Sequence, residues 1–295
     1  MVNLKGKAIA MKLKTLLKDL PLKKVKGSKE IAITGVCADS RCVAPGNLFI
    51  ARSGKKFAAQ DLIPQALSAG AVAIVTDLYD PFVSGSVQII VKDLQETAAV
   101  IAQRYYKNPS QELFLTGITG TNGKTTTSFL VRYLLPNCGL IGTIEYDLGR
   151  SHLFADRTTP DNLTLQKYLR EMCANKLQAA VMEVSSHALD QGRCERLDFD
   201  IAVFTNLTQD HLDYHQNMES YFNAKKKLFA GLPADKMALI NIDCPYGRKL
   251  IGATAAKVVT YGIENKAAQW RAADIQLSLQ GTTFTLQGQL FTVPL

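Results

Sequence analysis

The sequence predicts an α/β protein of two domains, the second carrying a largely parallel sheet with a short antiparallel extension. Apolar runs typical of strands alternate with amphipathic stretches typical of helices along the chain, as in parallel sheets covered by helices. With 295 residues the chain is long for one core and suits two. The segment "KNPS" at 107–110 interrupts the pattern, and a proline disfavours helix before it. We therefore predict domains at 1–108 and 109–295.

The first domain is expected to contain three strands and two helices. Short apolar runs rich in Val, Ile and Phe predict strands at 46–51, 71–77 and 87–93. Apolar residues spaced three and four apart predict helices at 58–70 and 94–106. This alternation predicts that the strands pair in parallel.

The second domain repeats the alternation on a larger scale. Apolar runs predict strands, and apolar residues at helical spacing predict helices between them. The expected strands are 112–119, 139–144, 178–185, 199–207, 236–243 and 257–262, and the expected helices are 124–135, 164–177 and 218–232. The last stretch, 273–295, alternates apolar and polar residues around glycines, which predicts an antiparallel ribbon.

Composition excludes several classes of protein. The chain is 47% hydrophobic and 20% charged, typical of a globular protein. The net charge of +8 comes largely from lysines before residue 27, and no aromatic-interleaved basic stripe follows, so we expect no nucleic-acid partner. The six cysteines form no CxxC pair, which argues against a zinc site or a disulfide framework. No signal peptide and no apolar stretch of membrane-spanning length is recognised, so we expect a cytoplasmic protein without membrane insertion.

The stretch "GITGTNGKTTT" at 117–127 follows a predicted strand and opens a predicted helix. In that context backbone N–H groups and the helix N-terminus can hold phosphate. Lys124 would reach the β- and γ-phosphates, and the Thr125 hydroxyl would bind Mg²⁺. Ile118 stands where the usual first glycine would be, so the strict spacing is not met. An ordinary glycine-rich turn is the alternative. The predicted ATP-binding residues are Gly120, Thr121, Asn122, Gly123, Lys124, Thr125 and Thr126.

Two further segments follow predicted strands. Glu183 ends an apolar strand, where a carboxylate must be paired or bind a metal unless the strand end is exposed. The stretch "NLTQDHLDYH" at 206–215 offers Asp210, His211, Asp213 and His215. Two histidines without a cysteine make zinc a weak hypothesis. We expect His215 to form a structural hydrogen bond.

Three other segments have ordinary structural interpretations. Thr159 before Pro160 is expected to cap a helix that begins at the proline. The lysines at 225–227 would form a solvated helix face. Asp39 would act as a local cap in the turn "DSR" at 39–41.

Taken together, these motifs resemble the Mur ligase family. The blocks DSR, GTNGKTT, EVSSHAL and NLTQDHLDYH, and then Lys225, occur in order, and the resemblance covers nearly the whole chain from about residue 31. EVSSH together with "TTP" at 158–160 is similar to the MurE-type branch. The resemblance implies an ATP-dependent amide ligase of peptidoglycan precursor synthesis. Such an enzyme activates a carboxylate of UDP-N-acetylmuramoyl-L-alanyl-D-glutamate as an acyl phosphate, which the amine of meso-diaminopimelate or L-lysine attacks.

The resemblance also implies roles for single residues. Lys124, His211 and Lys225 would be catalytic. Lys225 would carry a CO₂-derived carbamate, and the family's Mg²⁺ ligands would correspond to Thr125, Glu183, His211 and carbamylated Lys225. Ser40 would face the uridine diphosphate of the substrate. Contacts to the muramoyl dipeptide would come from Thr158, Thr159, Ser185, Gln191 and Arg193.

The end of the sequence departs from the family pattern. Mur ligases carry a C-terminal domain that binds the incoming amino acid, and the sequence stops at Leu295 before such a domain. We therefore expect a P-loop ATPase domain that is itself incomplete and a 295-residue chain without ligase activity. Two alternatives are a glutamate ligase similar to folylpolyglutamate synthase, and a non-catalytic module that binds the UDP-muramoyl peptide and nucleotide. The sequence makes no prediction of oligomeric state.

Overall fold

The computed structural model describes residues 10–52 and 59–294. Lysines 5 and 7 of the basic N-terminal segment lie outside these residues. The chain forms two compact units, and they do not follow a single cut in the sequence. Unit 1 comprises Met1–Pro109 and Asn162–Arg170, and unit 2 comprises Ser110–Asp161 and Glu171–Leu295.

Unit 1 is built on a five-stranded sheet in the order β2-β7-β6-β5-β4. Its central strands are buried on both faces, between two hydrophobic clusters, as expected of parallel strands covered by helices. Strand β2 pairs with β7 in the antiparallel sense, and the remaining neighbours are parallel. The strands are β2 (Leu22–Lys26), β4 (Gly35–Cys37), β5 (Asn47–Ile50), β6 (Ala73–Thr76) and β7 (Val87–Val91).

The two main helices of unit 1 fall where helical spacing predicted them. The stretch from Met11, whose leucines 13, 16, 17 and 20 predict an amphipathic helix, contains a further short helix, and several short strands were not predicted. The two main helices are α2 (Ala59–Ser68) and α3 (Leu94–Tyr105). The Asp93 carboxylate accepts a hydrogen bond from the Glu96 N–H at 2.9 Å, which caps α3. The smaller elements are α1 (Leu13–Leu16), the 3₁₀ turn η1 (Ser40–Cys42) and the strand pair β1 (Met11–Lys12) and β3 (Ala32–Ile33).

Unit 2 contains an eleven-stranded sheet in the order β11-β10-β9-β12-β8-β13-β14-β15-β16-β17-β18. From β9 to β16 all neighbours are parallel, and both ends of the sheet are antiparallel. The parallel strands are β8 (Phe114–Thr119), β9 (Cys138–Ile141), β12 (Ala179–Glu183), β13 (Ile201–Phe204), β14 (Met237–Asn241), β15 (Lys257–Gly262) and β16 (Trp270–Ser278). The mixed α/β class with a largely parallel sheet is therefore confirmed.

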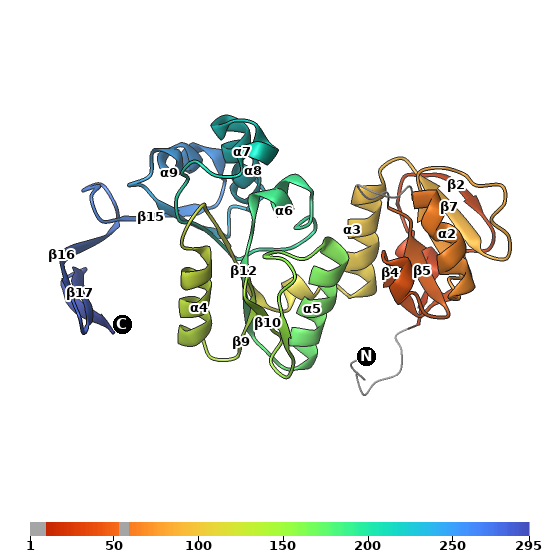
Figure 1. The fold of residues 1–295 in the computed structure, drawn as a ribbon, viewed down its shortest axis with the longest axis horizontal. Helices are drawn as coiled ribbons and strands as arrows, with labels where there is room; N and C mark the ends of the chain where they lie inside the picture. Colours follow the sequence, from red (N-terminus) through yellow and green to blue (C-terminus); the bar gives the residue numbers. More distant parts are fainter. Residues whose placement is uncertain (1–9, 53–58, 295) are drawn as a thin grey trace. The chain divides into compact units, whose positions relative to one another are not determined.

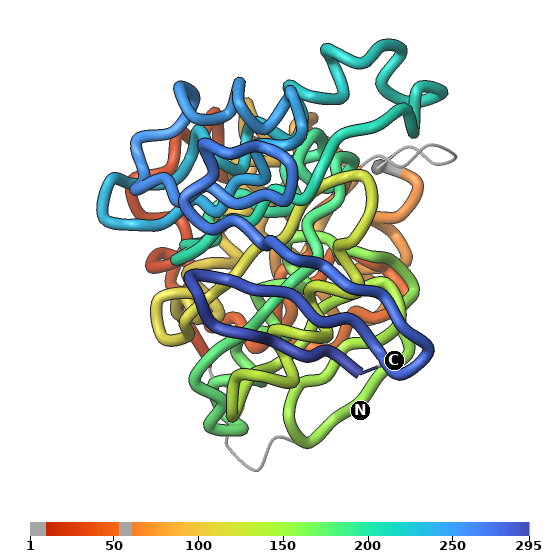
Figure 2. Tube along the Cα trace, turned by 90° about the vertical axis from the view of Figure 1, so that its left-hand side faces the viewer, coloured from red at the N-terminus to blue at the C-terminus, as the bar shows by residue number. Residues whose placement is uncertain are grey.

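The antiparallel strands lie at the two edges of this sheet. At one edge β10 (Glu145–Asp147) and β11 (His152–Phe154) form a short hairpin that the sequence did not predict. At the other edge β16, β17 (Gly281–Leu286) and β18 (Gln289–Pro294) form the predicted ribbon, seen in dark blue in Figure 2.

Helices connect the strands of unit 2. Helix α4 packs against β12, β9 and β8 (Figure 1), and α6 packs against α8. The helices are α4 (Lys124–Leu134), α6 (Ser186–Asp190), α7 (Leu212–His215), α8 (Met218–Ala230) and α9 (Pro245–Leu250), with the 3₁₀ turn η3 (Ile251–Ala253). Helix α5 (Asn162–Ala174) and the 3₁₀ turn η2 (Pro109–Gln111) belong partly to unit 1. In the described part of the chain no helix has the length and apolar character needed to cross a membrane.

The carboxyl ends of four adjacent parallel strands meet at one edge of the sheet. Glu183 at the end of β12 pairs with Ile118 of β8, and Phe204 at the end of β13 pairs with Thr119. The segments that follow β9, β12, β8 and β13 are therefore neighbours. Ligand sites of open α/β sheets form at such edges.

Candidate active site

The phosphate loop connects β8 to α4 through two glycines with positive φ. Gly120 has φ 154° and Gly123, at the start of α4, has φ 84°. A Cβ atom on Gly120 would lie 1.8 Å from the Thr205 hydroxyl oxygen. The loop therefore requires glycine there, both for its backbone conformation and for the closeness of β13. Thr126 lies exposed in the first turn of α4.

The segment after β13 holds the loop from outside. The N–H of Thr121 donates to the Asn206 carbonyl at 2.9 Å. The N–H of Asn122 donates to the Asn206 side-chain oxygen at 3.0 Å, and the Thr205 hydroxyl donates to the Asn122 carbonyl at 2.6 Å. These bonds fix the path of the loop without using the helix N-terminus, which stays available for an anion.

Two lysines converge on one oxygen of this loop. The ammonium of Lys124 donates to the carbonyls of Gly120 at 3.0 Å and Thr121 at 2.9 Å. The ammonium of Lys225, from α8, donates to the same Gly120 carbonyl at 2.8 Å. Lys225 is 1% exposed, so it does not belong to a solvated lysine face. Burial and the nearby Lys124 charge lower the pKa of Lys225 to about 7, against a smaller opposing effect of Asp210.

Glu183 lies fully buried beside the start of α4. Its carboxylate oxygen Oε2 accepts a hydrogen bond from the Thr125 hydroxyl at 2.9 Å, and Oε1 accepts one from the Thr143 N–H at 2.9 Å. The Thr143 hydroxyl oxygen lies 2.9 Å from Oε2. The alternative of a solvated glutamate is therefore wrong. Sequence reasoning missed Thr143 because it assigned 139–144 to a strand, whereas β9 ends at Ile141.

The predicted dipeptide-contact residues lie together near the end of β12. The Thr159 hydroxyl donates to the Glu183 carbonyl at 2.8 Å and accepts a bond from the Ser185 N–H at 3.1 Å. The Arg193 guanidinium donates to the Thr159 carbonyl at 2.7 Å and to the Gln191 side-chain oxygen at 2.7 Å. Thr158 lies 3.0 Å from the Thr143 hydroxyl oxygen. One polar network therefore joins all five residues.

The prediction that Thr159 caps a helix beginning at Pro160 is wrong. Helix α5 begins two residues later, at Asn162. The Thr159 hydroxyl instead bridges the backbone groups that follow β12. A capping pattern in the sequence cannot distinguish the two outcomes, because both use the same hydroxyl as a local hydrogen-bonding group.

The rings of His187 and Tyr221 lie near His211. The backbone of His211 has φ 52°. The centroid of its ring lies 6.1 Å from that of Tyr221, and the Tyr221 ring centroid lies 4.6 Å from the Lys225 ammonium. Asp210 is the carboxylate partner of His211, with 3.5 Å between Oδ2 and Nε2. Tyr221 was not predicted as a site residue, although its position four residues before Lys225 places it on the same face of α8.

His215 has the structural role expected of it. It is buried, and its Nε2 lies 2.9 Å from the Ser186 hydroxyl oxygen. The ring of its neighbour His187 lies against that of Tyr214, with 4.2 Å between ring centroids and a tilt of 41°. Burial lowers the pKa of both histidines, and neighbouring positive charges add to the effect. The centroid of the His187 ring also lies 4.9 Å from that of the His211 ring.

Ser40 belongs to unit 1. It is buried, and its hydroxyl donates to the Gln65 side-chain oxygen at 2.6 Å. Asp39 accepts a hydrogen bond from the Arg41 N–H at 3.0 Å, as expected of a local cap. The Arg41 guanidinium beside it holds the pKa of Asp39 below its usual value.

The donor set suits a hard cation on one side of this cluster. The Thr125 hydroxyl and the Glu183 carboxylate are in contact and supply the oxygen ligands that Mg²⁺ prefers. His211 is not part of this pair, and within 10–52 and 59–294 no three His, Cys, Asp or Glu side chains gather as a metal site. Lys225 suits a carbamate, because a buried amine with a lowered pKa is neutral enough to react with CO₂.

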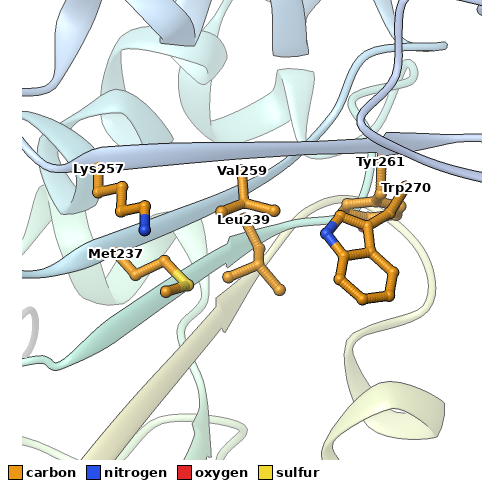
Figure 3. Close-up of a pocket in the computed structure, with 6 residues that line it drawn as sticks. All are labelled: Met237, Leu239, Lys257, Val259, Tyr261 and Trp270. Atoms are coloured by element: carbon orange, nitrogen blue, oxygen red, sulfur yellow. The ribbon is translucent and has the colours of Figure 1, made fainter.

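A separate hollow of about 540 Å³ lies on the sheet of unit 2 (Figure 3). Its lining is mainly apolar and comes from Met237, Leu239, Lys257, Val259, Tyr261 and Trp270 on strands β14, β15 and β16. It shares no residue with the cluster at the strand ends. The predicted site and this hollow are therefore different features.

Comparison with known proteins identifies the family of this chain. The profile of the Mur ligase middle domain matches residues 118–295, and that of the Mur ligase family catalytic domain matches residues 32–106. UDP-N-acetylmuramoyl-L-alanyl-D-glutamate–2,6-diaminopimelate ligases of Chlamydia caviae and Chlamydia pneumoniae are 44% and 45% identical over 280 residues. Each alignment covers 94% of this chain and 58% of the relative.

Solved structures show the same likeness. A structure of a UDP-N-acetylmuramoyl-L-alanyl-D-glutamate–2,6-diaminopimelate ligase superposes with a TM-score of 0.80 at 29% identity, over 97% of this chain and 59% of that one. MurF from Acinetobacter baumannii shares the fold, with a TM-score of 0.69 at 17% identity over 98% and 62% of the two chains. The chain thus spans less than two thirds of the length of these relatives. Since the middle-domain profile alone matches more than half of its residues, the chain belongs to the Mur ligase family.

Proposed function

We propose that this chain supplies the ATP-binding and carboxylate-substrate-binding parts of a Mur ligase that extends UDP-N-acetylmuramoyl-L-alanyl-D-glutamate by one diamino acid. The convergence of Lys124 and Lys225 on the Gly120 carbonyl, beside the Thr125–Glu183 pair, carries the proposal. A phosphate loop with a second buried amine and a buried carboxylate at adjacent strand ends suits phosphoryl transfer to a carboxylate. We place the activity in the cytoplasm.

The loop residues 120–126 would bind the phosphates of ATP. The N–H groups of Thr121 and Asn122 donate to Asn206, so the donors at the N-terminus of α4 are the ones that favour anions. Lys124 now donates to two backbone carbonyls, and phosphate oxygens would replace these as stronger, charge-assisted acceptors. Burial lowers the pKa of Lys124, and the Glu183 and Asp210 charges oppose this. Lys124 would therefore bring a positive charge to the γ-phosphate as negative charge shifts toward the leaving ADP.

Lys225 would act after carbamylation. The ammonium would first lose one proton. The neutral Nζ would then attack the carbon of CO₂, forming an N–C bond as one C=O π pair moves to oxygen, and would lose a second proton, so that a cationic side chain becomes an anionic carbamate. The buried position with a pKa of about 7 favours the neutral amine required for this step. The carbamate, Thr125, Glu183 and His211 would hold Mg²⁺, which when bound neutralises charge on the transferring phosphate.

The network around Arg193 would bind the muramoyl dipeptide. Arg193 is half-buried, and burial lowers its pKa from a very high value, so it keeps its charge for a carboxylate. Arg193 contacts Thr159 and Gln191. Ser185 joins the same network through Thr159, and Thr158 joins it through Thr143. Ser40 in unit 1 would face the uridine diphosphate.

The reaction would proceed in two steps. A carboxylate oxygen of the bound dipeptide attacks the γ-phosphorus of ATP, and ADP leaves. The amine of the diamino acid then attacks the acyl carbon, phosphate leaves, and the nitrogen loses a proton. The curated relatives are named for 2,6-diaminopimelate, which favours diaminopimelate over L-lysine as the amine.

Binding to the 295-residue chain tests the proposal. We expect UDP-N-acetylmuramoyl-L-alanyl-D-glutamate to raise the melting temperature well beyond UDP alone, since a ligand at a hundred times its Kd stabilises by about 2.7 kcal/mol. Arg193→Met should remove the difference, whereas Arg271→Met on exposed β16 should not. A shift with a folate and none with the UDP-dipeptide would instead identify a folate-type glutamate ligase.

A further inference from the structure

Thr143 connects two groups of predicted site residues. It follows the carboxyl end of β9, and Gly142 before it lies so close to Glu183 that a Cβ atom there would be 2.7 Å from Oε1. The Thr143 N–H donates to Oε1 at 2.9 Å. Its hydroxyl oxygen lies 2.9 Å from Glu183 Oε2 and 3.0 Å from the Thr158 hydroxyl oxygen. One hydroxyl therefore touches the phosphate-loop side and the dipeptide side of the site.

A threonine hydroxyl has one proton to donate and two lone pairs that accept. The Thr143 hydroxyl is placed to donate to both oxygens, so Glu183 Oε2 and the Thr158 hydroxyl compete for its single proton. Whenever that proton goes to the carboxylate, Thr158 can stay hydrogen-bonded to Thr143 only by donating its own proton. The hydroxyl proton of Thr158 is then held toward Thr143.

A cation bound at Glu183 changes this arrangement. The Thr125 hydroxyl already shares Oε2, so a cation there competes with both hydroxyls for the same lone pairs. Once Thr143 no longer donates to Oε2, its proton can turn to Thr158. The Thr158 hydroxyl is then released to donate to a bound substrate.

A second contact path keeps the rest of the dipeptide side fixed. The Thr159 hydroxyl is bonded to the backbone of Glu183 and Ser185, which does not depend on the state of the carboxylate. Thr158 is thus the member of the pair whose hydrogen bonding can change. Thr143 is exposed, so removing its hydroxyl leaves the core of unit 2 intact.

We propose that Thr143 is a positioning residue that couples Mg²⁺–nucleotide binding at Thr125 and Glu183 to binding of the UDP-dipeptide at Thr158. The inference rests on the proposed function, because it uses the ligands assigned there. Binding of one ligand raises the affinity for the other, and the reciprocal effect is equal.

Isothermal titration of the 295-residue chain tests this coupling. The probes are Mg²⁺ with a non-hydrolysable ATP analogue and UDP-N-acetylmuramoyl-L-alanyl-D-glutamate, each titrated alone and with the other saturating. We expect at least about a fivefold mutual gain in affinity for the wild type. Thr143→Val should bring the gain close to onefold, and Thr143→Ser, which keeps the hydroxyl, should preserve it.

Thr158→Val provides an independent variant, since it breaks the same hydroxyl chain without touching Glu183. It should also abolish the gain that the dipeptide gives to nucleotide affinity, even if Thr143→Val failed to fold. The inference is overturned if Thr143→Val or Thr158→Val keeps the affinity gain of the wild type, or if Thr143→Ser loses it as fully as Thr143→Val. It is also overturned if the wild type binds both probes without any mutual gain. Each of these outcomes leaves the proposed function standing. A wild type that binds neither probe overturns both.

Discussion

Lys124 and Lys225 donate to the same oxygen, the carbonyl of Gly120, at 3.0 and 2.8 Å. They come from different helices, α4 and α8, and meet only because β8 and β13 are neighbours in the sheet. Two ammonium groups at one carbonyl repel each other, so the arrangement favours loss of one charge. Lys225 is the more deeply buried and loses it first, with its pKa lowered to about 7.

Carbamylation of Lys225 should therefore be detectable on the chain itself. With ¹³C-labelled bicarbonate at pH 8 we expect a single protein carbamate signal in the ¹³C NMR spectrum. The signal should weaken below pH 7, where the amine becomes protonated. Lys225→Met should abolish it, and Lys226→Met, a substitution at the next position of α8, should keep it. An unchanged spectrum for Lys225→Met would reject the assignment.

The pH dependence of stability should also report Lys225. Its pKa is about 7 in the folded chain and 10.5 as the ordinary value, so the unfolded state binds more protons between these limits. The free energy of unfolding should rise with pH across this window. Below about pH 7 the buried Lys225 cation lowers the free energy of unfolding by its full amount, a few kcal/mol. Above pH 10.5 the side chain is neutral in both states, and this loss of stability disappears.

Lys225→Met removes this titration. In CO₂-free buffer the variant should gain stability over the wild type at pH 7, and the gain should shrink as the pH approaches 10. Urea unfolding at several pH values measures it, with Lys226→Met as the control. A gain that is constant with pH would contradict the lowered pKa.

Gly120→Ala should damage the loop through a specific clash. The new Cβ would lie 1.8 Å from the Thr205 hydroxyl oxygen, and the backbone at φ 154° is unfavourable for alanine. We expect a loss of about 1–3 kcal/mol in unfolding free energy and weaker nucleotide binding. Gly252→Ala, where nothing lies within 4 Å, should change stability by less than about 0.5 kcal/mol. Adding Thr205→Ala should recover part of the Gly120→Ala loss.

Asp243 should contribute to stability in a pH-dependent way. It follows β14, and its carboxylate accepts N–H bonds from Ile263 at 2.6 Å and Asn265 at 2.8 Å, and from Glu264. Burial raises its pKa, but the three donors together outweigh this and lower it. Its stabilisation is present above the ordinary pKa of 3.8 and is lost as the pH falls through the lowered folded value.

Asp243→Asn should therefore destabilise by about 1–3 kcal/mol at pH 7, and by less in acid. Urea unfolding at pH 7 and near pH 3 compares the two conditions. Asp235→Asn, at an exposed position, is the control. Equal losses at both pH values would show that the charge of Asp243 is not the stabilising element.

Strong local patterns were predictable, and weak or long-range ones were not. Helix α3 has apolar residues at helical spacing after the capping residue Asp93, and strand β12 is an apolar run that ends at Glu183. The sequence predicted both close to their observed bounds. Strand β2 was missed because "LKKVK" is mostly lysine, although lysine suits an exposed edge strand. Its apolar residues Leu22 and Val25 pack inward across a register shift, which breaks simple alternation.

The candidate site divides in the same way. Glu183 could be predicted because an acidic residue among apolar ones at a strand end demands a partner. Thr143 could not, because a threonine two residues after β9 is compatible with any loop. Its importance depends on β9 lying beside β12, which is a property of the strand order and not of the local sequence.

The support of the phosphate loop by Thr205 and Asn206 has a consequence for transplanting and evolving such loops. A graft of residues 117–125 into another α/β protein would carry the glycines and Lys124 but leave behind half of the scaffold that shapes them. Substitutions at the end of β13 would likewise change the conformation of the phosphate loop while its own amino-acid sequence stayed the same. The site is therefore inherited as a pair of segments, one after β8 and one after β13. A motif search that scores only the loop after β8 examines one of these two segments.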